Sequence, residues 1–209
     1  MIQLEHISKR YVGPSGTVDA LKDVSVHVEK GDIYGIIGSS GAGKSTLLRM
    51  VNQLEKPDTG TVTVAGRELS RLSKAELRKM RRKIGMVFQQ FNLLESKTVF
   101  QNVAIPLILE GIPKEKIADY VQEVVQRFGL SRIIDALPPS LPLGHRQRLS
   151  LAAAVIHRPK ILILDEPTSG VDPVARDGFW NLLLELSRRD GVTIFISTHF
   201  MNEAERCDR

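Results

Sequence analysis

The sequence contains one cysteine, Cys207, among its 209 residues. A single thiol excludes an internal disulfide framework, and it suits a reducing compartment. Long apolar runs are also missing, since no stretch approaches the roughly 20 residues that a membrane-spanning helix needs. The first residues lack the apolar segment of a signal peptide. We therefore expect the protein in the cytoplasm, with any role at the membrane supplied through a partner.

Hydrophobicity and charge predict a folded domain but leave the class of partner open. Apolar residues make up 42% of the chain, which is enough for a core and excludes extensive disorder. The formal net charge of +5 suits nucleic acid, anionic lipid headgroups or an anionic nucleotide. Many soluble domains that bind none of these carry a similar charge. The length predicts one domain with a small insertion.

Two hydrophobic patterns predict the strands. Alternation with a period of two predicts a strand covered on one face, and a continuous apolar run predicts a strand covered on both faces. The alternating strands are predicted at residues 24–28 and 61–64, and the continuous ones at 33–38, 84–88, 161–164 and 193–197.

Helical periodicity fills the intervals between these strands. The predicted helices run from 44 to 54, from a capping box at 73–76 to 83, over 113–129, from 145 onward, and over 175–186. The helix that ends at 83 is basic, which favours a solvated face over a nucleic-acid patch. Strands that alternate with helices predict an α/β fold with a mainly parallel sheet. Between about 91 and 158 only helices are predicted, which indicates a helical insertion.

Residues Gly38–Ser45 read GSSGAGKS and match G-x-x-x-x-G-K-S, the pattern of a phosphate-binding loop. The segment follows a predicted strand and opens a predicted helix, which is the context that the pattern requires. Its glycines let backbone N–H groups point inward at an anion. In such loops, Lys44 would reach the β- and γ-phosphates and the Ser45 hydroxyl would hold Mg²⁺. The sequence therefore predicts a nucleoside triphosphate site.

Four polar residues at strand ends complete the predicted site. Asp165 ends a buried strand, where it would bind the metal, and Glu166 would orient and activate the water that attacks the γ-phosphate. Gln89 follows another strand and would contact metal and water. His199 follows a third strand and would contact the γ-phosphate. The carboxyl ends of strands in such a sheet face the ligand, so these side chains are expected to meet.

The sequence resembles an ABC transporter ATP-binding subunit. The resemblance lies in the order and spacing of the phosphate loop, Gln89, Asp165–Glu166, the SGVD segment at 169–172 and His199. The resemblance covers essentially the whole chain. It implies a P-loop NTPase fold of the ABC type with an antiparallel β region near the N-terminus. It also implies an ATP-binding core at about 1–90 and 159–209 and a helical subdomain at about 91–158.

The resemblance also implies roles for single residues, with ATP and Mg²⁺ as ligands. Tyr11 would stack on adenine, and Ser169 and Asp172 would belong to the D-loop. The residues implied in nucleotide binding are Tyr11, Gly38, Ser39, Ser40, Gly41, Ala42, Gly43, Lys44, Ser45 and Thr46. Those implied in catalysis are Glu166, His199 and Gln89, and those implied around the metal are Ser45, Gln89 and Asp165.

Partners follow from the same resemblance. Family members act as head-to-tail dimers, in which each ATP lies between the phosphate loop of one copy and the signature loop of the other. The loop that carries Gln89 faces a transmembrane permease subunit. We therefore expect a homodimer or heterodimer of nucleotide-binding domains, held at the inner face of the cell membrane by permease subunits. Direct DNA binding is not expected.

The expected signature loop departs from the family pattern. The family pattern is Leu-Ser-Gly-Gly-Gln. Its five places are taken here by Leu141, Pro142, Leu143, Gly144 and His145. Pro142 removes the serine hydroxyl and a backbone N–H, and Leu143 adds bulk where glycine allows close approach. His145 replaces glutamine. We therefore expect a homodimer to bind ATP but to hydrolyse it slowly.

Different parts of the chain resemble different branches of the family. Residues up to about 130 resemble the ATPase of a bacterial methionine importer, whereas those from about 140 resemble export-type and ribosome-associated ABC ATPases. A natural mosaic and an engineered fusion would both produce this change. The segment expected to face the membrane partner, 89–106, is importer-like, which favours an ATPase subunit that powers methionine import. The alternative is an export-type or ribosome-associated ATPase, with the ribosome as partner.

Two further expectations concern the size of the chain. A chromosome-maintenance ATPase of related fold would need a long coiled-coil insertion, for which the interval from Gln89 to Pro142 is too short. The chain stops soon after His199. We therefore expect a C-terminal truncation that removes the closing strands of the family and the regulatory domain of methionine-importer ATPases.

Overall fold

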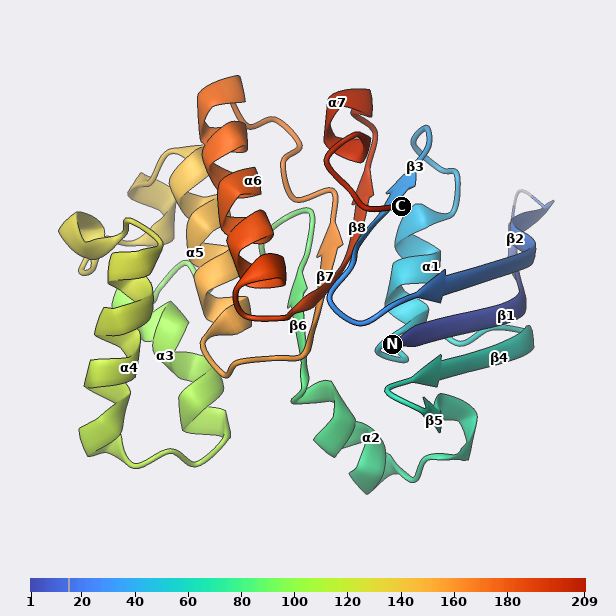
Figure 1. The fold of residues 1–209 in the computed structure, drawn as a ribbon, viewed down its shortest axis with the longest axis horizontal. Coiled ribbons are helices and arrows are strands. Elements are labelled where there is room, and N and C mark those ends of the chain that lie inside the picture. The colour runs from blue at the N-terminus through green and yellow to red at the C-terminus, as the bar shows by residue number, and fades with distance from the viewer. Residues whose placement is uncertain (15) are drawn as a thin grey trace.

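The computed structural model describes residues 1–14 and 16–209 as two β-sheets with helices between and beside them (Figure 1). The strand order is β2-β1-β4-β5 in an antiparallel sheet and β3-β8-β7-β6 in a parallel sheet. The parallel sheet stands in the middle, with the antiparallel sheet on one side and a group of helices on the other. This arrangement confirms the predicted α/β fold and its antiparallel region near the N-terminus.

The structure contains the predicted strands and helices in the predicted order, and it adds two strands and two α-helices that the sequence patterns did not predict, at 2–13, 67–68, 99–109 and 201–204. The strands are β1 (Ile2–Gly13), β2 (Gly16–Val28), β3 (Ile33–Ile37), β4 (Thr59–Val64), β5 (Arg67–Glu68), β6 (Ile84–Val87), β7 (Ile161–Asp165) and β8 (Thr193–Thr198). The helices are α1 (Lys44–Met50), α2 (Lys74–Arg81), α3 (Val99–Leu109), α4 (Lys114–Arg127), α5 (Leu143–Val155), α6 (Pro173–Arg188) and α7 (Met201–Ala204). Among the described residues, none of the helices is long and apolar enough to cross a membrane.

The parallel sheet is buried on both faces, which explains its continuous apolar runs. Along β7, Ile161 and Ile163 pack in a core with α1 and the antiparallel sheet. Leu162 and Leu164 pack in a second core with α3, α4, α5 and α6. Successive side chains of a strand point to opposite faces, so a strand covered on both faces must be apolar at every position.

The register of the parallel sheet brings the carboxyl ends of its strands to one edge. Ile37 at the end of β3 pairs with Thr198 at the end of β8. Asp165 at the end of β7 pairs with Ser197, and Val87 at the end of β6 pairs with Leu164. The polar residues that follow these four strands therefore emerge side by side.

The antiparallel strands are longer than the segments that the alternation predicts. β2 runs from Gly16 to Val28, but its first four residues are all exposed. β1 lies between β2 and β4, with Ile2 opposite both Val28 and Val64. Only the inner part of the sheet packs against α1, so only that part shows the alternating pattern.

Two predicted helix limits are wrong. α1 ends at Met50, so Leu54 lies outside it and is 51% exposed. α5 begins at Leu143 rather than at His145, with Pro142 at the N-cap. Gly144 belongs to the helix and faces α6 closely: a Cβ on Gly144 would lie 2.8 Å from the Cβ of Ala175. The glycine permits this close packing, and it does not break the helix.

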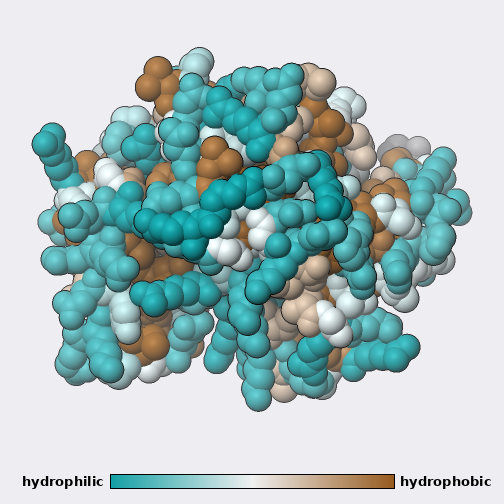
Figure 2. Space-filling model, in the orientation of Figure 1, coloured by the Kyte–Doolittle hydropathy of each residue, from teal (hydrophilic) through white to brown (hydrophobic). Residues whose placement is uncertain are grey.

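The capping box before α2 is confirmed. The Ser73 hydroxyl accepts a hydrogen bond from the Glu76 backbone, and the Glu76 carboxylate accepts one from the Ser73 backbone. Hydrogen bonds from the backbone and side chain of Ser73, and then from Arg67, lower the pKa of Glu76 to about 2. Figure 2 shows the face around α6 and α2 covered mostly by hydrophilic side chains, with small separate apolar patches. This is consistent with a solvated basic helix.

Candidate functional site

The predicted phosphate loop joins the carboxyl end of β3 to the first turn of α1 (Figure 1). Gly43 forms the N-cap of α1 with a φ of 86°, a conformation that favours glycine. A Cβ at Gly43 would lie only 2.4 Å from the backbone oxygen of Ala20. Glycine is therefore required here both by backbone conformation and by close packing against β2. Residues 38–43 otherwise lie at the surface, where a ligand can reach their N–H groups.

Lys44 is folded back onto the loop and is only 5% exposed. Its Nζ donates hydrogen bonds to the backbone oxygens of Gly38 at 2.7 Å and Ser39 at 2.9 Å. It also forms an ion pair of 3.0 Å with Oε1 of Glu166. Three protein oxygens therefore lie within 3.0 Å of the ammonium nitrogen. An incoming phosphate would compete with Glu166 for Lys44.

Asp165 is the buried acid of the site, 1% exposed at the end of β7. Its Oδ1 accepts hydrogen bonds from the hydroxyls of Ser45 at 2.7 Å and Ser197 at 3.0 Å. A guanidinium nitrogen of Arg49 lies 3.6 Å from the other carboxylate oxygen. These contacts compensate a charge that would otherwise be costly to bury.

The residues around Asp165 fit Mg²⁺ bound together with a nucleotide. The Ser45 hydroxyl and the Asp165 carboxylate are adjacent oxygen donors, and Mg²⁺ prefers oxygen ligands. Within residues 1–14 and 16–209, no group of three or more His, Cys, Asp or Glu side chains is placed to hold a metal. Mg²⁺ commonly uses one or two carboxylates together with water and substrate phosphates, which is the donor set available here.

Glu166 and His199 lie next to Lys44 at the same edge. Glu166 has a φ of 46°, and its N–H is bonded to Ser197, whose hydroxyl oxygen lies 3.0 Å away. One carboxylate oxygen of Glu166 contacts Lys44, and the other lies 3.4 Å from Nδ1 of His199. A positioned carboxylate can accept a proton from water as a general base.

The structure brings Lys44, Ser45, Asp165, Glu166 and His199 into one connected cluster. It does not join Gln89 or Tyr11 to that cluster. Gln89 is exposed two residues after β6, at the same edge of the sheet, and its side chain makes no hydrogen bond within the described residues. Tyr11 lies in β1, 40% exposed, with Nζ of Lys9 at 5.4 Å from its ring centroid. The roles of both residues stay predictions.

The expected signature loop lies at the start of α5, on the other side of the parallel sheet from α1 (Figure 1). Leu141 is buried, whereas Leu143 is 38% exposed beside Gly170. In the described part of the chain, no hydrogen bond or ion pair joins residues 141–145 to the phosphate loop. The expected D-loop lies nearby. Asp172 caps α6 by accepting a hydrogen bond from the Ala175 N–H, and the Ser169 N–H donates to the backbone carbonyl oxygen of Glu166.

Two contacts of the site were missed by the sequence reasoning. Ser197 holds both Asp165 and Glu166, although its type and position in β8 give no distinguishing signal. Glu203 is 1% exposed and accepts hydrogen bonds from the hydroxyls of Thr168 and Thr198, which lie close in sequence to Glu166 and His199. An acid four residues beyond His199 in a polar segment looks like a solvated side chain, so its burial could not be predicted.

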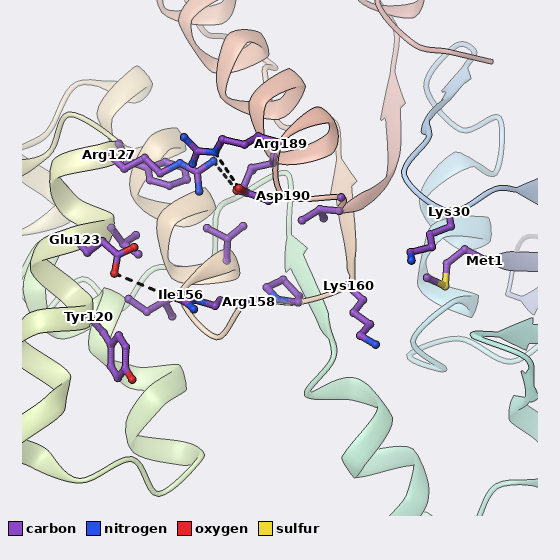
Figure 3. Close-up of a pocket in the computed structure, with 17 residues that line it drawn as sticks. Met1, Lys30, Tyr120, Glu123, Arg127, Ile156, Arg158, Lys160, Arg189 and Asp190 are labelled. Atoms are coloured by element: carbon purple, nitrogen blue, oxygen red, sulfur yellow. Dashed lines mark hydrogen bonds and ion pairs between the residues drawn. The ribbon is translucent and has the colours of Figure 1, made fainter.

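A cavity of about 740 Å³ lies elsewhere, at the amino ends of the parallel strands (Figure 3). Its lining includes Lys160, directly before β7, and Lys30, shortly before β3. Arg127 pairs with Asp190 at 2.6 Å across its upper wall. None of the phosphate-loop residues lines it. This cavity is therefore separate from the cluster around Lys44.

Comparisons with known proteins agree with the geometry of the site. Residues 21–169 match the profile of the family described as ABC transporter. The chain is 47% identical over 210 aligned residues to the methionine import ATP-binding protein MetN of Geobacillus kaustophilus. It is 49% identical over 209 residues to methionine import ATP-binding protein MetN 1 of Salmonella choleraesuis. Both alignments cover 100% of this chain, which spans 61% of the length of each relative.

Solved structures share the fold. A dimeric structure of MJ0796, a bacterial ABC transporter cassette, superposes with a TM-score of 0.92 at 34% identity, covering 100% of this chain and 92% of that one. CbiO1 of Clostridium perfringens superposes with a TM-score of 0.87 at 31% identity, covering 99% of this chain and 82% of that one. The profile match, the identities and the shared fold show that this chain belongs to the ABC transporter family, with the fold of its ATP-binding cassettes.

Proposed function

We propose that this chain is the ATP-binding and ATP-hydrolysing domain of an ABC transporter subunit. The observation that carries the proposal is the connected cluster of Lys44, Ser45, Asp165, Glu166 and His199 behind a glycine-dependent loop. Similarity supports it, since a second structure of MJ0796 is described as a post-hydrolysis state bound to ADP and Pi.

The contacts suggest how these residues act on ATP. The backbone N–H groups of the loop and the Lys44 ammonium bind the phosphates, and Lys44 exchanges Glu166 for phosphate oxygens. Mg²⁺, held by Ser45 and Asp165, would neutralise phosphate charge when bound. The freed Glu166 carboxylate then accepts the proton of the attacking water, while His199 donates a hydrogen bond to the γ-phosphate.

We further propose that the full-length protein powers methionine import. The relatives that support this substrate are at least 47% identical and match the whole chain, including its C-terminal third. That coverage does not favour the ribosome-associated or export-type alternative. In this proposal, two nucleotide-binding domains pair head to tail, and the helical subdomain at about 91–158 contacts permease subunits at the cytoplasmic face of the membrane.

Uptake by reconstituted vesicles tests the proposed function. The full-length protein and its permease subunits are placed in vesicles with ATP on the side of the nucleotide-binding domain, and entry of labelled methionine is measured. We expect ATP-dependent methionine uptake that the Glu166→Gln variant lacks, with labelled leucine as the comparison solute. ATP hydrolysis without methionine uptake would contradict the substrate. Purification with ribosomes instead of a permease would favour the alternative.

The signature loop gives a second prediction. A homodimer would carry Pro142 at both sites, where a hydroxyl and an N–H would otherwise meet the γ-phosphate. Loss of one such donor typically costs about 10²- to 10³-fold in rate. We therefore expect the combined change Pro142→Ser, Leu143→Gly and His145→Gln to raise steady-state ATP hydrolysis at least about tenfold. The protein concentration must exceed that for dimerisation.

The matched control keeps the loop and alters a neighbouring exposed residue, Val174→Ala, which is 82% exposed at the start of α6. We expect that variant to hydrolyse ATP at the parent rate. No rise in the triple variant, with dimer formation verified, would mean that the exposed N-terminus of α5 already suffices as a partner for phosphate.

A further inference from the structure

Glu203 is a buried carboxylate that takes no direct part in the proposed chemistry. It lies in α7, just beyond β8, and is 1% exposed. Its Oε1 accepts a hydrogen bond of 2.6 Å from the Thr168 hydroxyl, and its Oε2 accepts one of 2.6 Å from the Thr198 hydroxyl. Both carboxylate oxygens are therefore occupied by hydroxyl groups from two different segments.

The two threonines belong to the loops that carry the predicted catalytic pair. Thr168 follows Glu166 by two residues, and Thr198 directly precedes His199. Thr198 Oγ1 also accepts a hydrogen bond of 3.0 Å from the N–H of Phe200, so it fixes the backbone on both sides of His199. A single carboxylate therefore joins the loop after β7 to the loop after β8.

Arg176 supports this connection from α6. Its Nε lies 3.6 Å from Oε1 of Glu203, and its guanidinium carbon lies 4.0 Å from the centroid of the Phe200 ring. The centroids of the Phe200 and His199 rings lie 4.0 Å apart. Arg176 therefore provides the positive charge that a buried carboxylate requires, and it stacks on the aromatic ring behind His199.

We propose that Glu203 is a positioning residue that sets the distance between Glu166 and His199. This inference rests on the proposed ATP hydrolysis. By holding Thr168 and Thr198, the carboxylate fixes the 3.4 Å approach of Glu166 Oε2 to His199 Nδ1. Among the described residues, no hydrogen bond or ion pair joins the Glu203 side chain to the phosphate loop. Its effect should therefore appear in the rate of hydrolysis and not in the affinity for ATP.

Truncation of Glu203 tests the proposal. We expect Glu203→Ala to lower kcat by about 10- to 100-fold, since small misplacements of reacting groups cost this much. The ATP dissociation constant should change by no more than about twofold, because the contacts of Lys44 and the loop are intact. We expect Glu203→Gln to retain kcat within about threefold, because its amide oxygen accepts one hydroxyl and its NH₂ donates to the other.

The measurements are kcat and KM for ATP hydrolysis by the full-length protein, with ATP affinity from calorimetry and folded fraction from circular dichroism. Glu205→Ala is the control, because Glu205 is exposed two residues further on and its side chain forms no hydrogen bond or ion pair with the described residues. Parent kcat in Glu203→Ala would overturn the inference. So would an equal loss of kcat and ATP affinity, or failure of Glu203→Gln to restore the rate.

A second pair of variants covers the case in which Glu203→Ala does not fold. Thr168→Val keeps the shape of the side chain and removes its hydrogen bond, whereas Thr168→Ser keeps the hydroxyl. We expect a loss of kcat in the first variant and near-parent kcat in the second. Equal rates in both would overturn the inference.

Hydrogen exchange separates this inference from the proposed function. In the nucleotide-free protein, loss of the Glu203 carboxylate should speed exchange of the Phe200 amide, which is bonded to Thr198. Unaltered exchange overturns the inference whether or not the protein hydrolyses ATP. Absence of hydrolysis in the parent protein, with faster exchange in the variant, would instead contradict the proposed function alone.

Discussion

Glu166→Gln is expected to lower kcat for ATP hydrolysis by about 10²- to 10⁴-fold, the usual contribution of a positioned general base. The amide has the shape of the carboxylate but cannot accept a proton from water. Nucleotide binding should persist, because the loop, Ser45 and Asp165 are unchanged. It should even strengthen, since Lys44 loses the 3.0 Å ion pair that phosphate would otherwise have to displace.

Steady-state hydrolysis and calorimetry of ATP binding together check this result. Glu205→Gln is the matched control, since it removes an exposed carboxylate without disturbing the site. A Glu166→Gln variant that hydrolyses ATP at the parent rate would assign the base to another group. Weaker ATP binding in that variant would show that the ion pair with Lys44 does not compete with phosphate.

Lys44→Ala is expected to weaken ATP binding by about 10- to 150-fold. The estimate corresponds to the loss of a charge-assisted hydrogen bond, about 1.5–3 kcal/mol, with tenfold in affinity for every 1.4 kcal/mol. Lys44 is the buried cation of the loop, and its Nζ contacts three protein oxygens. The backbone N–H groups remain, so we expect residual binding.

Calorimetry with Mg-ATP measures this effect, and the same titration with EDTA present should show weaker binding in the parent protein. Lys116→Ala is the control, because that lysine lies exposed on α4, outside the site. The substitution Lys44→Ala leaves the Glu166 carboxylate without its paired cation, which could destabilise the fold. Circular dichroism must therefore show that this variant is folded. Unchanged affinity in a folded Lys44→Ala variant would contradict the assignment of the loop.

Some elements of the fold were predictable because their signals are local. The capping box before α2 and the glycine-dependent turn before α1 each depend on residues a few positions apart. The limits of α1 and α5 were predicted less well. Gly144 lies in the first turn of α5, and its lack of a side chain allows the close approach of α6. That contact is tertiary, so it leaves no local signal from which the start of α5 could be predicted.

The sequence by itself determined most of the strands and helices, the phosphate loop and the two acids at the end of β7, because spacing and side-chain type specify these features. Only the tertiary structure decided which charged groups meet. The Ser45 hydroxyl reaches Asp165 across 120 residues of chain, and Glu203 joins Thr168 across 35. Such contacts arise because the parallel pairing of β3 with β8 and of β8 with β7 aligns strand ends that are distant in sequence. Burial then lets one carboxylate, Glu203, hold the segments that carry Glu166 and His199.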